Sequence, residues 1–271
     1  MPELPEVEVI RTELIPKIIN QHIKNIEVFW HKTFVNLCCD LPIDNKIIDT
    51  DRVGKYLIFV LEQNYLIIHL RMTGQLIFAK SSNNSRKHLR ASILMNSGDI
   101  LNFYDSRKFG RIYHVSDLNK FFIKVGVDAL SQKFTSNYFI ELLSKCKRGI
   151  KSFLLDQKYI SGLGNIYIDE CLFISGIHPQ KMTNGINAKN ALQLHRNIKK
   201  ILTSAIDNMG TTISDYRTSG GGFGTNQNSL KVYGREGEAC LNCKSKIIKI
   251  RINSRGTHFC PVCQPENGVF Q

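Results

Sequence analysis

The sequence predicts an α+β protein of two domains: an N-terminal antiparallel β-sandwich with a flanking N-terminal helix, and a C-terminal helical bundle followed by a β-hairpin. Three observations predict this class. Residues 23–116 contain short apolar or alternating segments separated by turn residues, which is typical of a sandwich or barrel. Residues 136–209 change to helical spacing, and residues 240–263 hold two Cys-x-x-Cys pairs. A chain of 271 residues is long enough for two such domains.

The first helix is predicted from Pro5 onward, because proline is favoured in a first turn and apolar residues follow at helical spacing, at Val7, Ile10, Leu14 and Ile18. Short strands are then expected at residues 23–30, 46–52, 56–62, 65–70, 76–79, 89–94, 100–104 and 110–115. One of the turns between them is expected at Ser81–Ser85. Residues 116–135 are expected to form a linker.

Further helices are predicted at residues 137–144, 166–174 and 188–208. The glycine-punctuated segment 154–165 precedes the second of them, and the free backbone N–H groups of such a helix start would suit a phosphate. An ordinary helix–turn–helix in a core is the alternative. A glycine-rich loop follows at residues 216–229, and it is expected to be flexible; no Gly-Lys-Ser/Thr follows it, which excludes a P-loop.

The charge is strongly basic, with 36 Lys and Arg against 23 Asp and Glu. Such an excess favours nucleic acid over an anionic membrane or an acidic substrate, because clustered cations release counterions when they bind phosphates. The cations form clusters around residues 86–90, 145–151 and 244–251, although a solvated basic surface remains the alternative. A composition that is 42% hydrophobic excludes disorder, and no apolar run is long enough for a membrane helix or follows a basic start as in a signal peptide.

Four of the eight cysteines form a metal-binding pattern. They are Cys240, Cys243, Cys260 and Cys263, two Cys-x-x-Cys pairs with sixteen residues between them. Each pair can chelate from one tight turn, and a hairpin brings the two pairs together, so the spacing predicts one structural zinc ion. A thioredoxin-type redox site would explain one pair and not both. The alternating segment 246–252 suits a strand of this hairpin, which is too small to stay folded without its metal.

The N-terminus carries a possible nucleophile. Met1 precedes Pro2, a small residue that permits removal of the initiator Met, and removal would leave a secondary amine beside Glu3. A terminal amine with a pKa near 8 is about 10% neutral at pH 7, far more than a lysine. Such an amine could attack a sugar carbon to give an iminium, and Glu3 could act as the acid that opens the ribose ring. The alternative is that proline and glutamate only start a helix.

Seven blocks of sequence resemble bacterial formamidopyrimidine-DNA glycosylases, and they occur in the family's order from residue 1 to 264. They are Met1–Glu8, His69–Gly74, Asp105–Gly110, Gly162–Tyr167, Ile177–Pro179, Val232–Gly237 and Gly256–Gln264. The resemblance implies a bifunctional glycosylase and AP lyase that removes 8-oxoguanine and formamidopyrimidines from double-stranded DNA. It also implies a monomer with one zinc ion. The absence of a targeting signal and the pattern of reduced cysteines predict a reducing bacterial cytoplasm, at the nucleoid.

The resemblance further implies the domains and the capping loop. An N-terminal catalytic domain would span residues 1–127, with a linker at 128–135. A helix–two-turn–helix domain would span 136–230, and its loop 216–226 would close over the flipped base. The zinc hairpin would span 231–271.

The family's catalytic residues map onto four positions of this chain. Pro2, as the mature N-terminus, would attack C1′ of the damaged nucleotide, and β- and δ-elimination would follow. Glu3 would protonate the sugar ring oxygen. Lys55 would contact the phosphate of the lesion, and Arg255 of the zinc hairpin a flanking phosphate. Glu6 would help to position the site.

The remaining DNA contacts are implied at six further positions. Met72, Arg107 and Phe109 would fill the space that the flipped base leaves, with the Arg107 fork on the orphaned cytosine. Asn165 would contact a flanking phosphate. Lys151 and Arg251 would contact the DNA backbone.

Three alternatives remain at this stage. An endonuclease VIII-type glycosylase for oxidised pyrimidines shares the proline, the helical motif and the zinc hairpin. A zinc-ribbon protein could bind DNA without catalysis, or the hairpin could bind a protein partner.

Overall fold

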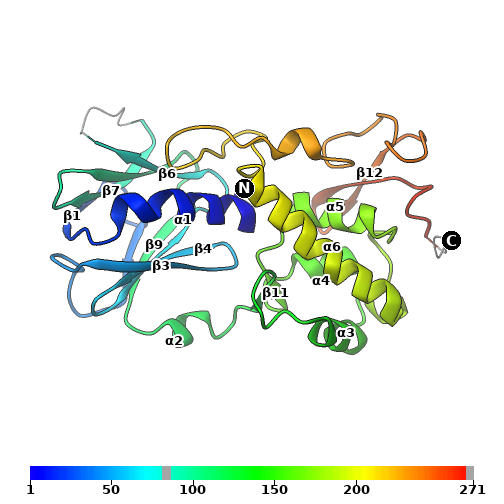
Figure 1. Cartoon of the computed structure of the whole chain (residues 1–271), viewed down its shortest axis with the longest axis horizontal. Helices are drawn as coiled ribbons and strands as arrows, with labels where there is room; N and C mark the ends of the chain where they lie inside the picture. The colour runs from blue at the N-terminus through cyan, green and yellow to red at the C-terminus, as the bar shows by residue number, and fades with distance from the viewer. Residues whose placement is uncertain (81–86, 267–271) are drawn as a thin grey trace. The chain divides into compact units, whose positions relative to one another are not determined.

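The computed structural model of the chain describes residues 1–80 and 87–266 (Figure 1). The expected turn at Ser81–Ser85, the cation Arg86 and the last five residues of the expected hairpin domain lie outside the described residues. The chain forms two compact units. One comprises residues 1–124 and 205–227, and the other comprises residues 125–204 and 228–271.

The first unit is a β-sandwich with the N-terminal helix α1 (Leu4–Ile18). One sheet has the strand order β1-β7-β8-β6, with bounds Ile23–Val28, Leu89–Met95, Ile100–Asp105 and Gly74–Ala79. The other has the order β2-β9-β5-β4-β3, with bounds Phe34–Asn36, Arg111–Val115, Tyr65–His69, Tyr56–Leu61 and Ile47–Val53. All pairs are antiparallel except β2 with β9, which is parallel.

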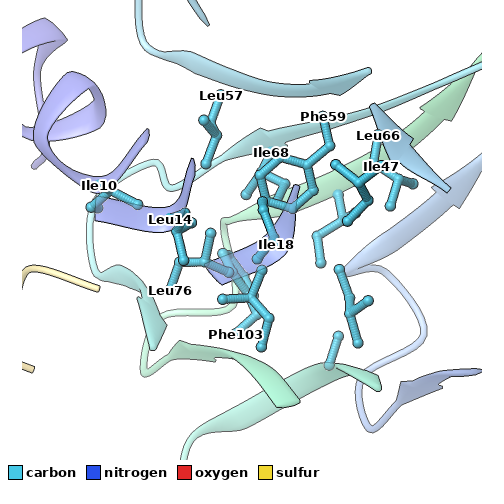
Figure 2. Packing of buried hydrophobic residues seen from close by; sticks show 14 of the residues in the cluster. Ile10, Leu14, Ile18, Ile47, Leu57, Phe59, Leu66, Ile68, Leu76 and Phe103 are labelled. Atoms are coloured by element: carbon cyan, nitrogen blue, oxygen red, sulfur yellow. The ribbon is translucent and has the colours of Figure 1, made fainter. Parts of the chain in front are cut away.

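Helix α1 contributes to the core of the sandwich. Its side chains Ile10, Leu14 and Ile18 recur at every fourth position and lie in one cluster with residues of both sheets (Figure 2). Phe59 comes from β4 and Phe103 from β8, and each is at most 1% exposed. The apolar stripe predicted from the sequence therefore fixes α1 on the sandwich.

The second unit is helical. Its helices are α3 (Ser136–Lys145), α4 (Ile150–Leu155), α5 (Asn165–Ile174) and most of α6 (Ala188–Asp207), and a short 3₁₀ turn spans Thr183–Gly185. A small parallel pair joins β10 (Val127–Asp128) to β11 (Ile160–Ser161). Within the described ranges, none of the helices combines the length and the apolar character needed to cross a bilayer.

The β-hairpin of the second unit consists of β12 (Ile248–Ile252) and β13 (Arg255–Phe259). Its register pairs Ile252 with Arg255, which leaves Asn253 and Ser254 as a two-residue turn. Both turn residues have positive φ, +48° and +61°, as a type I′ hairpin turn requires. The turn therefore places Arg255 at the tip of the hairpin.

The α+β class, the sandwich, the helical region and the hairpin agree with the sequence prediction. The short elements that were not predicted include β2, α4, the pair β10 and β11, and helix α2 (Leu118–Phe122) inside the expected linker. The units also differ from the expected domains: the second unit begins at residue 125, and residues 205–227, expected to belong to the helical domain, group with the sandwich.

Candidate active site and nucleic-acid interface

The N-terminal turn of α1 is fixed by reciprocal hydrogen bonds. Glu3 is the N-cap residue, and its carboxylate accepts the backbone N–H of Glu6. The Glu6 carboxylate in turn accepts the backbone N–H of Glu3, at 2.7 Å to Oε2. This capping box satisfies N–H groups that a helix start leaves without partners. Glu3 and Glu6 are 2% and 1% exposed, whereas Met1 before the buried Pro2 is 45% exposed.

The geometry of this turn suits an amine nucleophile at residue 2. The positive end of the α1 dipole disfavours a protonated amine there and so favours its neutral form. Glu3 follows immediately in the chain, with its backbone held by the capping box. The predicted nucleophile and the predicted acid are therefore neighbours on one rigid turn.

Lys55 lies in the two-residue turn Gly54–Lys55 between β3 and β4, and it is only 6% exposed. Gly54 allows this turn because its φ is +58°. The neighbouring His69, at the end of β5, is a buried titratable residue that sequence reasoning did not select. Its Nδ1 accepts the backbone N–H of Arg71 at 3.0 Å, so the neutral ring carries its proton on Nε2. Burial, and then the charges of Arg71 and Lys55, lower the pKa of His69 to about 3.

The depressed pKa of His69 predicts a pH-dependent stability. Below pH 6.5 the unfolded state binds a proton that the folded state rejects until about pH 3, so stability is lost as the pH falls through this window. We expect the free energy of unfolding to fall by about 1 kcal/mol per pH unit from this group between pH 6 and pH 4. Denaturant unfolding at a series of pH values checks this, with His69→Gln as the reference. Equal slopes for the two proteins would contradict it.

Met72, Arg107 and Phe109 lie together in the structure. The Arg107 Nη1 is 3.5 Å from the Met72 sulfur, and the Arg107 guanidinium lies over the Phe109 ring at 5.0 Å from its centroid. Arg107 is exposed, and Phe109 is 48% exposed although it is a large apolar residue. We call these three residues the wedge cluster. An exposed group of a thioether, a guanidinium and a ring is the kind of chemistry that inserts between base pairs.

Asp105 connects the two loops that carry the wedge cluster. Its Oδ1 accepts hydrogen bonds from the Thr73 hydroxyl and from the backbone N–H of Arg107, and its Oδ2 accepts the N–H of Gly110 at 2.7 Å. Asp105 is 1% exposed. It lies inside the block Asp105–Gly110 of the sequence, but nothing in that block shows that the carboxylate joins the Thr73 turn to the Arg107 loop.

Replacing Asp105 should therefore displace the wedge cluster. We expect Asp105→Ala to lower lesion excision in duplex DNA on the order of 10- to 100-fold, because a shift of about 1 Å in a positioning group has such effects. The loss should be smaller for an abasic site in single-stranded DNA, where no base has to be extruded from a stack. Single-turnover cleavage of both substrates measures this, and an equal loss on both would contradict the assigned role.

Residues 210–226 form a loop with a closed neck in the first unit. Gly224 donates its N–H to the Thr212 hydroxyl at 2.9 Å, and Asn226 donates its N–H to the Gly210 carbonyl at 3.1 Å. A Cβ on Gly224 would lie 2.1 Å from the Gly210 carbonyl oxygen, so only glycine fits there. Glu6 Oε1 accepts the N–H of Thr211 at 2.8 Å. The catalytic turn and the neck of the loop are therefore joined through Glu6.

Asn165 and Arg255 lie at neighbouring positions in the second unit. Asn165 begins α5, and its Nδ2 donates to the carbonyl of Gly256 at 2.9 Å. Arg255 precedes Gly256 at the start of β13, and its side chain is exposed. The start of α5 and the hairpin tip together offer an amide and a guanidinium, a pair that suits phosphate oxygens.

Lys151 does not fit its predicted contact with the DNA backbone. Its side chain has no exposed surface, and its Nζ lies 2.6 Å from Asp169 Oδ1. Asp169 also accepts the backbone N–H of His258 at 2.8 Å, so this pair holds α4, α5 and β13 together. The prediction is wrong because the sequence cluster of cations does not reveal a buried carboxylate eighteen residues away.

A second carboxylate of α5, that of Glu170, holds residues 231–233, which precede the hairpin in the chain. Glu170 accepts the backbone N–H groups of residues 231–233, at 2.8 to 2.9 Å. Burial raises its pKa, although these three hydrogen bonds oppose that effect. Asp169 and Glu170 were missed by sequence reasoning, since adjacent acids on a helix normally face solvent.

The four predicted cysteines converge on one point. Their sulfur atoms all lie within 4.8 Å of one another, with Cys240 to Cys263 at 3.8 Å and Cys243 to Cys260 at 3.4 Å. Zn–S bonds of about 2.3 Å in a tetrahedron place sulfur atoms about 3.8 Å apart, so the donor set fits zinc. Three of the four cysteines are buried with Phe173, Val232 and Ile247 in a small cluster, which the metal would complete.

Family comparisons cover nearly the whole chain. The formamidopyrimidine-DNA glycosylase N-terminal domain matches residues 1–112, the formamidopyrimidine-DNA glycosylase H2TH domain matches 125–217, and a zinc finger found in FPG and IleRS matches 237–265. This chain belongs to the formamidopyrimidine-DNA glycosylase family. The resemblance seen in the sequence is thus confirmed, and the zinc-finger match together with the four sulfur atoms supports one structural zinc ion.

Relatives in the family are similar along their full length. A formamidopyrimidine-DNA glycosylase of Lactobacillus helveticus is 40% identical over 274 residues, which cover 97% of this chain and 99% of that protein. A Lactococcus lactis FPG mutant in complex with DNA that contains Fapy-dG is 38% identical, with a TM-score of 0.90 over 97% of this chain and 100% of that one. The Thermus thermophilus member has 34% identity and a TM-score of 0.90, over 98% and 100% of the two chains.

Proposed function

We propose that this chain is a bifunctional DNA glycosylase and AP lyase of base excision repair, which removes oxidised purines from double-stranded DNA. The observation that carries the proposal is the capped N-terminal turn with Pro2 and Glu3, in a chain that matches the family along its length. The basic charge suits a DNA substrate. We further propose that the protein acts as a monomer in the bacterial cytoplasm, on the DNA of the nucleoid.

The chemistry begins at Pro2 after removal of Met1. The Pro2 nitrogen forms a bond to C1′ of the damaged nucleotide while the bond from C1′ to the base breaks. The base leaves with the electron pair of that bond and takes up the proton that the nitrogen releases. Glu3 protonates the ring oxygen as the sugar opens, which leaves an iminium between Pro2 and C1′. Loss of a C2′ proton then expels the 3′ phosphate, and a second elimination expels the 5′ phosphate. Glu6 holds the turn in place.

Recognition of the damaged nucleotide uses the remaining residues of both units. The wedge cluster of Met72, Arg107 and Phe109 fills the space that the extruded base leaves. Lys55 contacts the phosphate of the lesion, and Asn165 and Arg255 contact flanking phosphates. The loop 216–226 closes over the base, and the exposed Arg251 contacts the backbone. The zinc ion holds the hairpin that carries Arg255.

Two other functions remain as competitors. The endonuclease VIII type acts on oxidised pyrimidines, and a Lactococcus lactis FPG structure contains DNA with an oxidised pyrimidine, so both lesion classes need to be tested. A zinc ribbon that binds DNA without catalysis is disfavoured, because the match includes the N-terminal domain and not the zinc finger alone.

The test is a strand-cleavage assay on three duplexes. One contains 8-oxoguanine opposite cytosine, one an oxidised pyrimidine, and one no damage. We expect cleavage at 8-oxoguanine with phosphates on both ends of the gap, and none in undamaged DNA. Faster cleavage at the pyrimidine lesion would favour the endonuclease VIII type. Binding without cleavage of either lesion would contradict a catalytic role.

A further inference from the structure

Two glutamates of helix α1 hold the two ends of the segment 211–219. At the first end, Glu6 Oε1 accepts the N–H of Thr211 at 2.8 Å, as described above. At the second end, Glu13 Oε2 accepts both the backbone N–H and the hydroxyl of Ser219, each at 2.7 Å. Two carboxylates of one helix therefore fix the two ends of the segment that leads into the capping loop.

Ser219 makes two further hydrogen bonds. Its carbonyl accepts the backbone N–H of Phe78 on β6 at 2.9 Å, and its hydroxyl accepts a hydrogen bond from Lys17 Nζ at 3.3 Å. Ser219 has no exposed surface. A buried N–H and a buried hydroxyl that share one carboxylate oxygen lose their partner together when that oxygen is removed, and such groups are costly to leave unsatisfied.

The glycine run of the loop is short. Between the fixed residues Ser219 and Gly224 lie three glycines and Phe223, which is 64% exposed. The Arg217 guanidinium lies over the Phe223 ring at 4.2 Å, and Thr218 donates its N–H to Gly222 at 3.0 Å. The glycine run that the sequence marks as flexible thus begins directly at the Glu13 contact.

The spacing of the two glutamates along α1 puts both of them on the same side of the helix. Glu6 and Glu13 are seven residues apart, which is two helical turns, so their side chains lie on one face of α1 about 10 Å apart. Glu6 also accepts the N–H of Glu3. One rigid helix therefore carries the catalytic turn, the start of the loop segment and the anchor of its glycine run.

We propose that Glu13 is a positioning residue for base excision. It anchors the capping loop at Ser219 and so fixes the glycine run relative to the catalytic turn at Glu3. This inference rests on the proposed function, in which loop 216–226 covers the extruded base. Glu13 has no contact with the reacting atoms in this account; it acts through Ser219.

The test compares a DNA substrate that carries the damaged nucleobase with one that already lacks it. Glu13→Ala should lower the single-turnover rate of 8-oxoguanine excision about 10-fold or more, because the loop loses its position over the base. Cleavage of a preformed abasic site, which presents no base to cover, should change less than about twofold. Glu13→Gln keeps a side-chain oxygen that accepts both hydrogen bonds, and it should restore most of the excision rate. The exposed Thr12→Ala on the same helical turn is the matched control.

Limited proteolysis gives a second readout of the anchor. Arg217 lies two residues before Ser219, and trypsin should cut after it faster in Glu13→Ala than in Glu13→Gln or Thr12→Ala. Unchanged excision in Glu13→Ala, or an equal loss on both substrates with unchanged cutting at Arg217, would overturn the role of Glu13. Absence of excision by the unmodified protein would instead overturn the proposed function on which the inference rests.

Discussion

Glu3→Gln should abolish removal of 8-oxoguanine while leaving DNA binding intact. A glutamine oxygen can still accept the N–H of Glu6, so the capping box and the N-terminal turn should persist. The amide has no acidic proton to deliver to the sugar ring oxygen, and loss of a general acid typically costs about 10²- to 10⁴-fold in rate. We expect a single-turnover excision rate lowered by that factor and an affinity for the damaged duplex within about threefold of the unmodified protein.

Two comparisons make the Glu3→Gln result specific. A preformed abasic site already reaches its ring-opened aldehyde without help, so its cleavage should fall much less than base excision. Glu27→Gln, at an exposed position on β1, is the matched control for removal of a carboxylate. Excision at the normal rate by Glu3→Gln would show that another group supplies the proton.

Cys243→Ser should remove the zinc ion and weaken binding to every duplex, damaged or not. A serine hydroxyl does not replace a thiolate at zinc, and the apolar cluster that the hairpin shares with Phe173, Val232 and Ile247 is small. Loss of the folded hairpin removes Arg255 and its neighbouring cations from the DNA. We expect zinc content to fall from one ion per chain to almost none, and affinity to fall on the order of 100-fold.

Metal analysis and DNA titrations on damaged and undamaged duplexes measure the effect of Cys243→Ser together. Cys39→Ser is the control, because Cys39 is an exposed thiol outside the four-cysteine site. A variant that loses zinc but binds both duplexes normally would contradict the assigned role of the hairpin.

The regular elements with strong local patterns could be predicted from the sequence. The apolar spacing of α1 appears where expected, because burial of one face is already present in the residue order. Strands β4 and β5 appear where short apolar runs predict them, because residues on both of their faces are buried. Strand β2 was missed since three residues carry no detectable alternation, and its parallel pairing with β9 comes from tertiary structure. Helix α4 was missed because its six residues span less than two turns.

The features of the candidate site also divide into those that the sequence could predict and those that it could not. The cysteine spacing identified the metal site, and the ordered blocks identified the family. The partners of individual side chains were beyond sequence reasoning, because they lie far away in the chain. Asp169 neutralises Lys151 across eighteen residues, Asp105 reaches back to Thr73, and Ser219 meets Glu13 across 206 residues. By charge alone Lys151 suited a phosphate, but it is buried and paired with Asp169, so it does not fit that contact.

The central claim is that the amine of Pro2 is the nucleophile, and borohydride trapping tests it most directly. The unmodified protein would be incubated with a duplex carrying 8-oxoguanine opposite cytosine, reduced, and digested for peptide mass mapping. Reduction converts an iminium into a stable bond between protein and DNA. A cross-link on Pro2 would establish removal of Met1, the nucleophile and the lesion class together. A cross-link on a lysine such as Lys55 would contradict the assignment of Pro2.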